Sequence, residues 1–161
     1  MDESKAMTYV IDAKGLILGR MASAAAELLM QGQKEKRDDR VIIVNAEEVV
    51  ISGRKSRIME TYRAKYALNH PRKGPFFPRM PDKIVKRTVR GMLPVNRKKS
   101  GRRAFANLRV EIGCPKHLID ELPTDHSRPE LPKDTLKVPE RGVTLNEICK
   151  VLGAPTERWS A

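Results

Sequence analysis

Three consecutive segments determine the fold: residues 8–12 are TYVID, residues 18–31 are LGRMASAAAELLMQ, and residues 41–44 are VIIV. The first and third are runs of β-branched residues, which are typical of buried strands. In the second, apolar residues recur at the spacing of one helical face, which predicts a helix from about Gly19 to Gln31, ended by Gly32. Strand, helix and strand within about 40 residues are typical of a right-handed βαβ unit, and so of an α/β fold.

Two more short strands are expected outside this unit. Residues 49–51 are apolar and β-branched, and residues 109–112 alternate polar and apolar side chains, as a strand at a sheet edge does. Apolar spacing predicts three further helices, at about 55–68, 82–93 and 101–108. Four prolines and a glycine exclude regular structure from residues 69–81.

The C-terminal part of the chain has a different composition. Residues 114–142 contain five prolines and nearly balanced charge, which predicts an extended tail without a core of its own. A short helix at 144–153 follows, with Thr144 and Glu147 in a capping-box pattern. We therefore expect one α/β domain at 1–113 and a Pro-rich tail at 114–161.

The positive charge is concentrated in one third of the chain. The 161 residues carry a formal net charge of +12, with 32 Lys and Arg against 20 Asp and Glu. The segment 54–109 holds 18 Lys and Arg but only two acidic residues, Glu60 and Asp82, so its charge is +16 and that of the remainder is −4. Nucleic acid is the commonest polyanion that offsets such self-repulsion. An anionic membrane or an acidic protein is the alternative partner.

The helix predicted at 82–93 has one aliphatic face and one cationic face. At about 100° per residue, its four cations fall within one arc of roughly 100°. They are Lys83, Lys86, Arg87 and Arg90. An ordinary surface helix would intersperse Glu to form i,i+4 pairs, so this face favours an external anion over the alternative of a merely solvated surface.

Further cations lie in the adjoining loops and helices. In the proline-stiffened loop, Phe76 and Phe77 are flanked by cations, and they either stack on unpaired bases or anchor the loop on the protein. A second dense cluster begins at Arg97. The complete set of predicted nucleic-acid-binding residues is Arg54, Lys55, Arg57, Arg63, Arg72, Lys73, Arg79, Lys83, Lys86, Arg87, Arg90, Arg97, Lys98, Lys99, Arg102 and Arg103.

Catalytic and metal-binding motifs are incomplete. Residues 12–20 lie where dinucleotide folds place a phosphate loop, but they lack G-x-G-x-x-G. Residues 53–56 resemble the end of a Walker loop, but Arg54 interrupts the Gly-Lys pair. The histidines show no ligand spacing, and Cys149 falls on an apolar helix face as a core residue. We expect no catalytic residue, no cofactor, no metal and no small-molecule substrate. A nucleotide-dependent enzyme built on the βαβ unit is the alternative.

Several motifs in order resemble the large-subunit ribosomal protein 13 family. They begin with VIDAKGLILGRMAS at 10–23 and continue with VNAE at 44–47 and ISGRK at 51–55. The most specific is RTVRGMLP at 87–94, which a basic stretch at 96–103 follows. The loop at 74–76, which leads through a proline into the basic helix, is similar to the archaeal and eukaryotic branch. Together the motifs extend over about two thirds of the chain.

The resemblance implies a three-layer α/β/α fold with a small, mainly parallel four-stranded sheet, a basic helical insertion, and an extended C-terminal tail ending in a short helix. It implies a structural constituent of the cytoplasmic large ribosomal subunit that clamps ribosomal RNA and aids assembly, without enzymatic activity. Neighbouring large-subunit proteins would be further partners. Since no apolar run approaches about 18 residues, we expect no membrane partner. A free regulatory RNA-binding protein is the other alternative.

Overall fold

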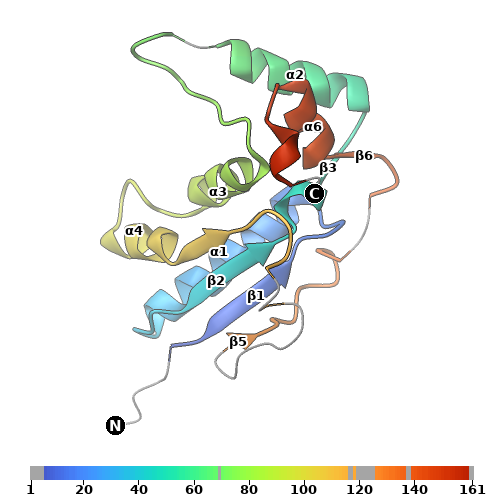
Figure 1. Ribbon diagram of the computed structural model, residues 1–161. Coiled ribbons are helices and arrows are strands. Elements are labelled where there is room, and N and C mark those ends of the chain that lie inside the picture. Colours follow the sequence, from blue (N-terminus) through green and yellow to red (C-terminus); the bar gives the residue numbers. More distant parts are fainter. Residues whose placement is uncertain (1–5, 69, 116–117, 119–125, 137–138, 160–161) are drawn as a thin grey trace.

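A four-stranded parallel sheet forms the centre of the computed structural model, which describes residues 6–68, 70–115, 118, 126–136 and 139–159 (Figure 1). The strand order is β4-β2-β1-β5. β1 (Thr8–Asp12) pairs along its whole length with β2 (Arg40–Val44). The outer strands are β4 (Leu108–Val110) beside β2 and β5 (His126–Ser127) beside β1, both parallel to their neighbours. This confirms the expected α/β fold with a small parallel sheet.

The crossover helix α1 (Leu18–Lys34) connects β1 to β2 and is longer than the sequence predicts. The prediction that Gly32 ends this helix was wrong, because this glycine serves close packing within the helix. A Cβ at Gly32 would lie 2.7 Å from the Cβ of Asp39 in the return loop. The buried Asp39 carboxylate accepts a hydrogen bond from the Met7 N–H at 2.9 Å and pairs with Arg37 at 3.2 Å. Gly32 thus lets the return loop lie against α1.

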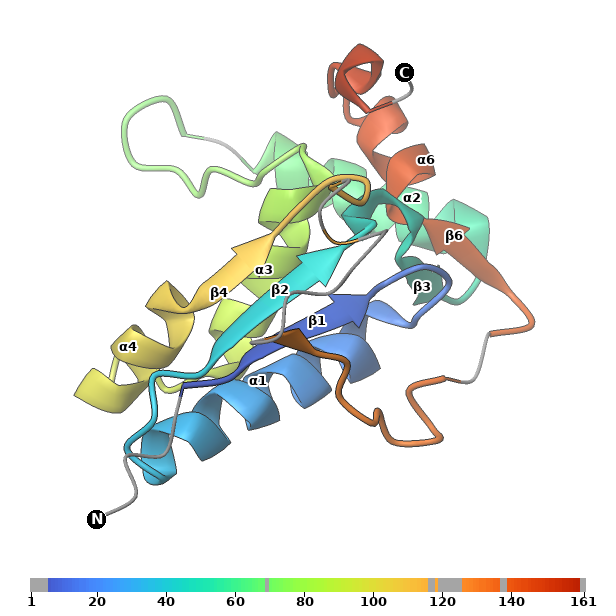
Figure 2. The same cartoon turned by 60° about the horizontal axis from the view of Figure 1, so that its bottom comes forward.

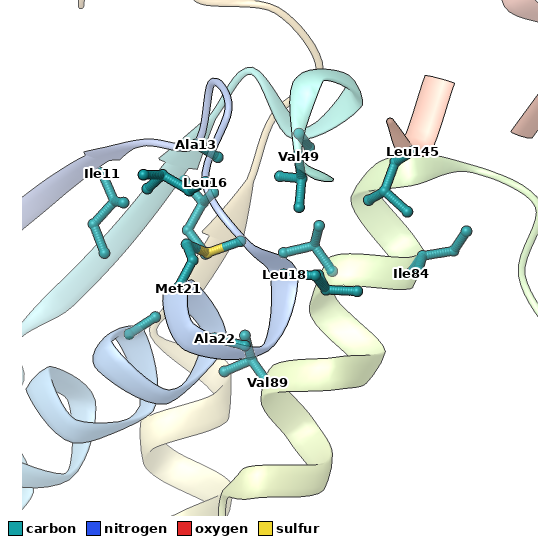
Figure 3. Packing of buried hydrophobic residues seen from close by; sticks show 14 of the residues in the cluster. Ile11, Ala13, Leu16, Leu18, Met21, Ala22, Val49, Ile84, Val89 and Leu145 are labelled. Carbon is teal, nitrogen blue, oxygen red and sulfur yellow. The ribbon is translucent and has the colours of Figure 1, made fainter. Parts of the chain in front are cut away.

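The main core lies between the sheet and three helices, namely α1, α3 (Pro81–Met92) and α4 (Lys99–Ala106) (Figure 2). Figure 3 shows Ala22 of α1 close to Val89 of α3. On the opposite face of the sheet, a smaller apolar cluster consists of Val10, Val44 and Leu118. Successive strand residues point to opposite faces, so the two clusters use alternate positions of the same strands.

A second, two-stranded sheet joins the middle of the chain to its C-terminal part. β3 (Val50–Ser52) pairs antiparallel with β6 (Gly142–Thr144), so the strand expected at 49–51 lies outside the main sheet. The chain changes direction after β2, because Asn45 takes a left-handed backbone conformation (φ 56°) and the 3₁₀ turn η1 (Ala46–Glu48) follows. The fourth strand of the main sheet is instead β5, from the region predicted as a tail.

The C-terminal helix packs on the body of the protein. Thr144 precedes α6 (Leu145–Val151) and its hydroxyl accepts a hydrogen bond from the Glu147 N–H at 3.4 Å, which confirms the predicted cap. Leu145, Ile148 and Cys149 are fully buried in the main core, and the short turn η2 (Thr156–Arg158) follows. The predicted tail therefore contributes core residues, while its positions 116–117, 119–125, 137–138 and 160–161 lie outside the described residues.

The expected helix at 55–68 is α2 (Lys55–Ala67), which lies beside α6 (Figure 1). The loop formed by residues 70–80 extends away from the body before α3 begins at Pro81. Among the described helices, none has the length and apolar content to span a membrane.

Candidate nucleic-acid interface

Helix α3 carries the centre of the candidate interface, and its packing determines which side faces outward. Ile84, Val85 and Val89 are buried against the core. Their burial directs the opposite face of the helix to solvent, and all four of its predicted cations are exposed. The division of this helix into an aliphatic and a cationic side is therefore confirmed.

An aromatic ring of α4 lies close to two of these cations. The Lys86 ammonium lies 5.5 Å from the centre of the Phe105 ring, and the Arg90 guanidinium carbon lies 5.9 Å from the same centre. A ring face attracts a cation without neutralising it, at about 0.5–1 kcal/mol for an exposed pair. Phe105 thus restricts where the two charges lie and leaves both available to an anion.

The loop between α2 and α3 is anchored by one of its two phenylalanines. The Phe77 ring packs edge-on against Tyr62 of α2, with the ring centres 5.7 Å apart. The Arg87 guanidinium carbon lies 5.2 Å from the centre of the Phe77 ring, and its Nη1 donates to the Phe76 carbonyl oxygen at 3.1 Å. Phe76 itself is 62% exposed. Of the two expected roles, Phe77 has that of anchoring the loop on the protein, whereas the Phe76 ring is accessible to a partner.

Arg79 and Lys65 are oriented in a similar way. The Arg79 guanidinium carbon lies 5.6 Å from the Tyr66 ring centre, and its Nη1 donates to the Gly153 carbonyl oxygen at 3.3 Å. Lys65 is an exposed residue of α2 whose ammonium lies 5.0 Å from the Tyr62 ring centre. The predicted set omits Lys65, although its i+3 spacing from Tyr62 on a helix is visible in the sequence.

The start of α2 differs, because one of its cations is already paired. The Lys55 ammonium lies 2.5 Å from a carboxylate oxygen of Glu147 in α6. Within the described part of the chain, Lys55 is the only one of the sixteen predicted cations in an ion pair. Arg54 and Arg57 line a separate hollow of about 360 Å³. The positive charge at the start of α2 is therefore partly neutralised by the C-terminal helix α6.

All sixteen predicted cations are exposed, but the structure brings only some of them together. Arg87, Arg90 and Arg97 line one hollow of about 660 Å³ at the end of α3. The separate hollow at the start of α2 holds Arg54 and Arg57. In the described part of the chain, the side chains of the following exposed members of the set make no hydrogen bond, ion pair or ring contact: Arg63, Arg72, Lys73, Lys83, Lys98, Lys99, Arg102 and Arg103.

The loop after β1, where a nucleotide-binding enzyme would place phosphate, is occupied by contacts within the protein. The Asp12 carboxylate accepts hydrogen bonds from the Lys14 N–H at 3.0 Å and the Asn45 side-chain amide at 2.8 Å. The Lys14 ammonium pairs with Glu48 at 3.3 Å, and Arg20 donates to the Asp134 carbonyl oxygen at 2.8 Å. These contacts engage the cations that a phosphate would need.

Neither cysteine has the character of an activated nucleophile. Burial, followed by the nearby Asp82 carboxylate, raises the pKa of Cys149 to about 12. Burial, followed by the charge of Asp12, also raises the pKa of Cys114. A catalytic thiol requires the opposite shift, toward thiolate at neutral pH. In the described ranges, no three His, Cys, Asp or Glu side chains lie together as a metal site.

Comparison with known proteins agrees with the resemblance found in the sequence. The model of the family described as ribosomal protein L13 matches residues 6–117. A "Large ribosomal subunit protein uL13" of Methanocaldococcus jannaschii is 43% identical over 149 residues, which cover 90% of this chain and 97% of that protein. Proteins of the same name from Methanosphaera stadtmanae (39% over 152 residues; 92% and 99% covered) and Methanosarcina barkeri (47% over 111 residues; 69% and 75% covered) are also similar. The chain belongs to the ribosomal protein L13 family.

Proposed function

We propose that this protein is a structural constituent of the cytoplasmic large ribosomal subunit and that its exposed cations bind ribosomal RNA. The observation that carries the proposal is the way these cations are held. Rings and carbonyl oxygens orient Arg79, Arg87 and Arg90, while no acidic side chain of the described residues pairs with any of the three. Cations that are held in position but not neutralised by acidic side chains are suited to binding a polyanion, because that binding releases counterions.

The relatives support the ribosomal setting of this surface. Two of the similar proteins, which this chain matches over 97% and 99% of their own length, carry the name of a large ribosomal subunit protein. We assign RNA contact to the sixteen cations predicted from the sequence and add Lys65, which lies among the same aromatic residues. In this proposal the body at 1–113 contains the RNA-binding segment 54–109, and the tail at 114–161 stabilises the start of α2.

Binding of this kind would depend on charge and shape. Arg and Lys contacts to phosphate fix the position of a protein on RNA but carry little sequence information. Such contacts from α3, α4 and the intervening loops would hold separate RNA segments together, which is how the protein would aid subunit assembly beside neighbouring ribosomal proteins. The proposed role requires no catalytic step.

Sedimentation of cell extract tests the proposal. We expect the protein, detected by antibody, to migrate with large ribosomal subunits, to resist a low-salt wash, and to be released at high salt as phosphate contacts weaken. Ribonuclease treatment of the same extract is the control and should shift the protein to lighter fractions. Migration near the top of the gradient, independent of ribonuclease, would overturn the ribosomal assignment.

A further inference from the structure

Gly91 is a helical glycine that nothing within the described protein explains. It lies in the last turn of α3, its backbone is not in the left-handed region, and the residue that caps the helix is Leu93. A Cβ built at Gly91 meets no atom within 4 Å. Since glycine is less favourable than alanine in a helix, Gly91 lowers the stability of the free protein without a compensating contact.

Gly101, the next helical glycine in the chain, is explained by packing within the protein. At Gly101, in α4, a Cβ would lie 2.5 Å from the carbonyl carbon of Pro94, so only glycine lets α4 lie against the turn after α3. Gly32 is explained in the same way by Asp39. Gly91 faces open space instead, as Gly19 does in α1, but only the space at Gly91 lies in a hollow lined by three arginines, which gives a physical reason for a glycine there: a contact outside this chain.

The open space at Gly91 is the hollow of about 660 Å³ described above. Three arginines from two sides of the turn line it, together with Asn96 and the turn residues Pro94 and Val95. Its lining contains no acidic residue. Guanidinium groups bind phosphate oxygens through paired hydrogen bonds, and the hollow has the volume of a typical small-ligand site. Charge and size therefore both fit a segment of sugar–phosphate backbone.

We propose that this hollow receives the backbone of the bound RNA and that Gly91 is the point of its closest approach to α3. The inference rests on the proposed function and adds to it a specific contact residue and a direction of approach, from the end of α3 across the turn to α4. Without a Cβ, the helix surface at Gly91 lets a phosphate or ribose come closer than any other residue would allow. Arg87 and Arg90, one turn before and directly beside Gly91, would then meet the flanking phosphates.

The test compares wild type with Gly91→Ala in two assays. The RNA probe is large-subunit ribosomal RNA purified from Methanocaldococcus jannaschii, and binding is measured by filter retention at one fixed salt concentration. We expect Gly91→Ala to raise the Tm by about 1–4 °C, because alanine favours the helix. We expect the same variant to weaken RNA binding about tenfold, because a methyl group displaces the backbone and at least one charge-assisted hydrogen bond is lost.

Gly19→Ala is the matched control, since a Cβ at Gly19 also meets nothing within 4 Å and Gly19 lies in α1, outside the hollow. We expect it to bind RNA as wild type does. Wild-type affinity for Gly91→Ala, an equal loss for both variants, or a lower Tm for Gly91→Ala would each overturn the inference while the proposed function stands. If wild-type protein fails to bind the RNA, the proposed function fails as well.

Discussion

The substitution Gly101→Ala has two opposite effects on stability, and the structure allows their sizes to be compared. Alanine improves the intrinsic stability of α4 by up to about 1 kcal/mol. Its Cβ, however, would lie 2.5 Å and 2.6 Å from the carbonyl carbon and oxygen of Pro94, and 2.9 Å from the Val95 nitrogen. All three are backbone atoms, so no side-chain rotation relieves the overlap, and overpacking of this kind costs about 1–3 kcal/mol.

We therefore expect Gly101→Ala to destabilise the protein by about 1–2 kcal/mol, which corresponds to a fall in Tm of about 2–8 °C. Thermal unfolding followed by circular dichroism measures it, with urea unfolding as a second measure of the free energy. The turn that must move also carries Arg97, so RNA affinity should fall too. A Tm equal to or above that of wild type would show that α4 and the turn are not packed as described.

Two further predictions concern an aromatic support and a buried thiol. Phe105→Leu should weaken RNA binding at unchanged net charge, because Lys86 and Arg90 lose the ring that orients them; filter binding at fixed salt, with Tm as the folding control, measures this, and unchanged affinity would contradict it. The pKa of Cys149 is raised to about 12 in the folded protein from an ordinary value of 9.0, so the unfolded chain loses this proton first. The stability that the neutral thiol contributes is thus present below about pH 9 and is lost as the pH rises toward 12. Urea unfolding between pH 8 and 11 should show a steeper decline for wild type than for Cys149→Ala, and identical declines would refute the assigned pKa.

The features that the sequence predicted well are those set by local periodicity. The apolar runs at 8–12 and 41–44, which form strands with buried residues on both faces, and the spacing of apolar residues in α3 are local patterns of the sequence. The outward direction of the α3 cations followed directly, because burying Ile84, Val85 and Val89 leaves no other orientation. The exposed, cationic face of α3 could therefore be predicted before any tertiary contact was known.

Other features depend on partners far away in the chain. β5 has two polar residues, His126 and Ser127, and becomes a strand only because the edge of β1 offers hydrogen-bonding groups. β3 pairs with a strand some 90 residues later, so its sheet had no local signal. The position of Phe105 beside the α3 cations likewise follows from the packing of α4.

The packing role of Gly32 also depended on a tertiary contact. A glycine near a helix end commonly marks a cap, and this one instead makes room for Asp39. Gly101 belongs to the same class, since its reason lies in the turn after α3.

The most direct test of the central claim is the salt dependence of RNA binding for wild type and the triple variant Lys86→Ala, Arg87→Ala, Arg90→Ala. Each phosphate contact contributes about 0.7–0.9 to the slope of log association constant against log salt concentration. If the α3 face binds phosphate, the wild-type slope is steep and the variant's slope is smaller in magnitude by about 2–3, with Tm little changed. Parallel slopes for the two proteins would contradict the claim that these cations contact RNA.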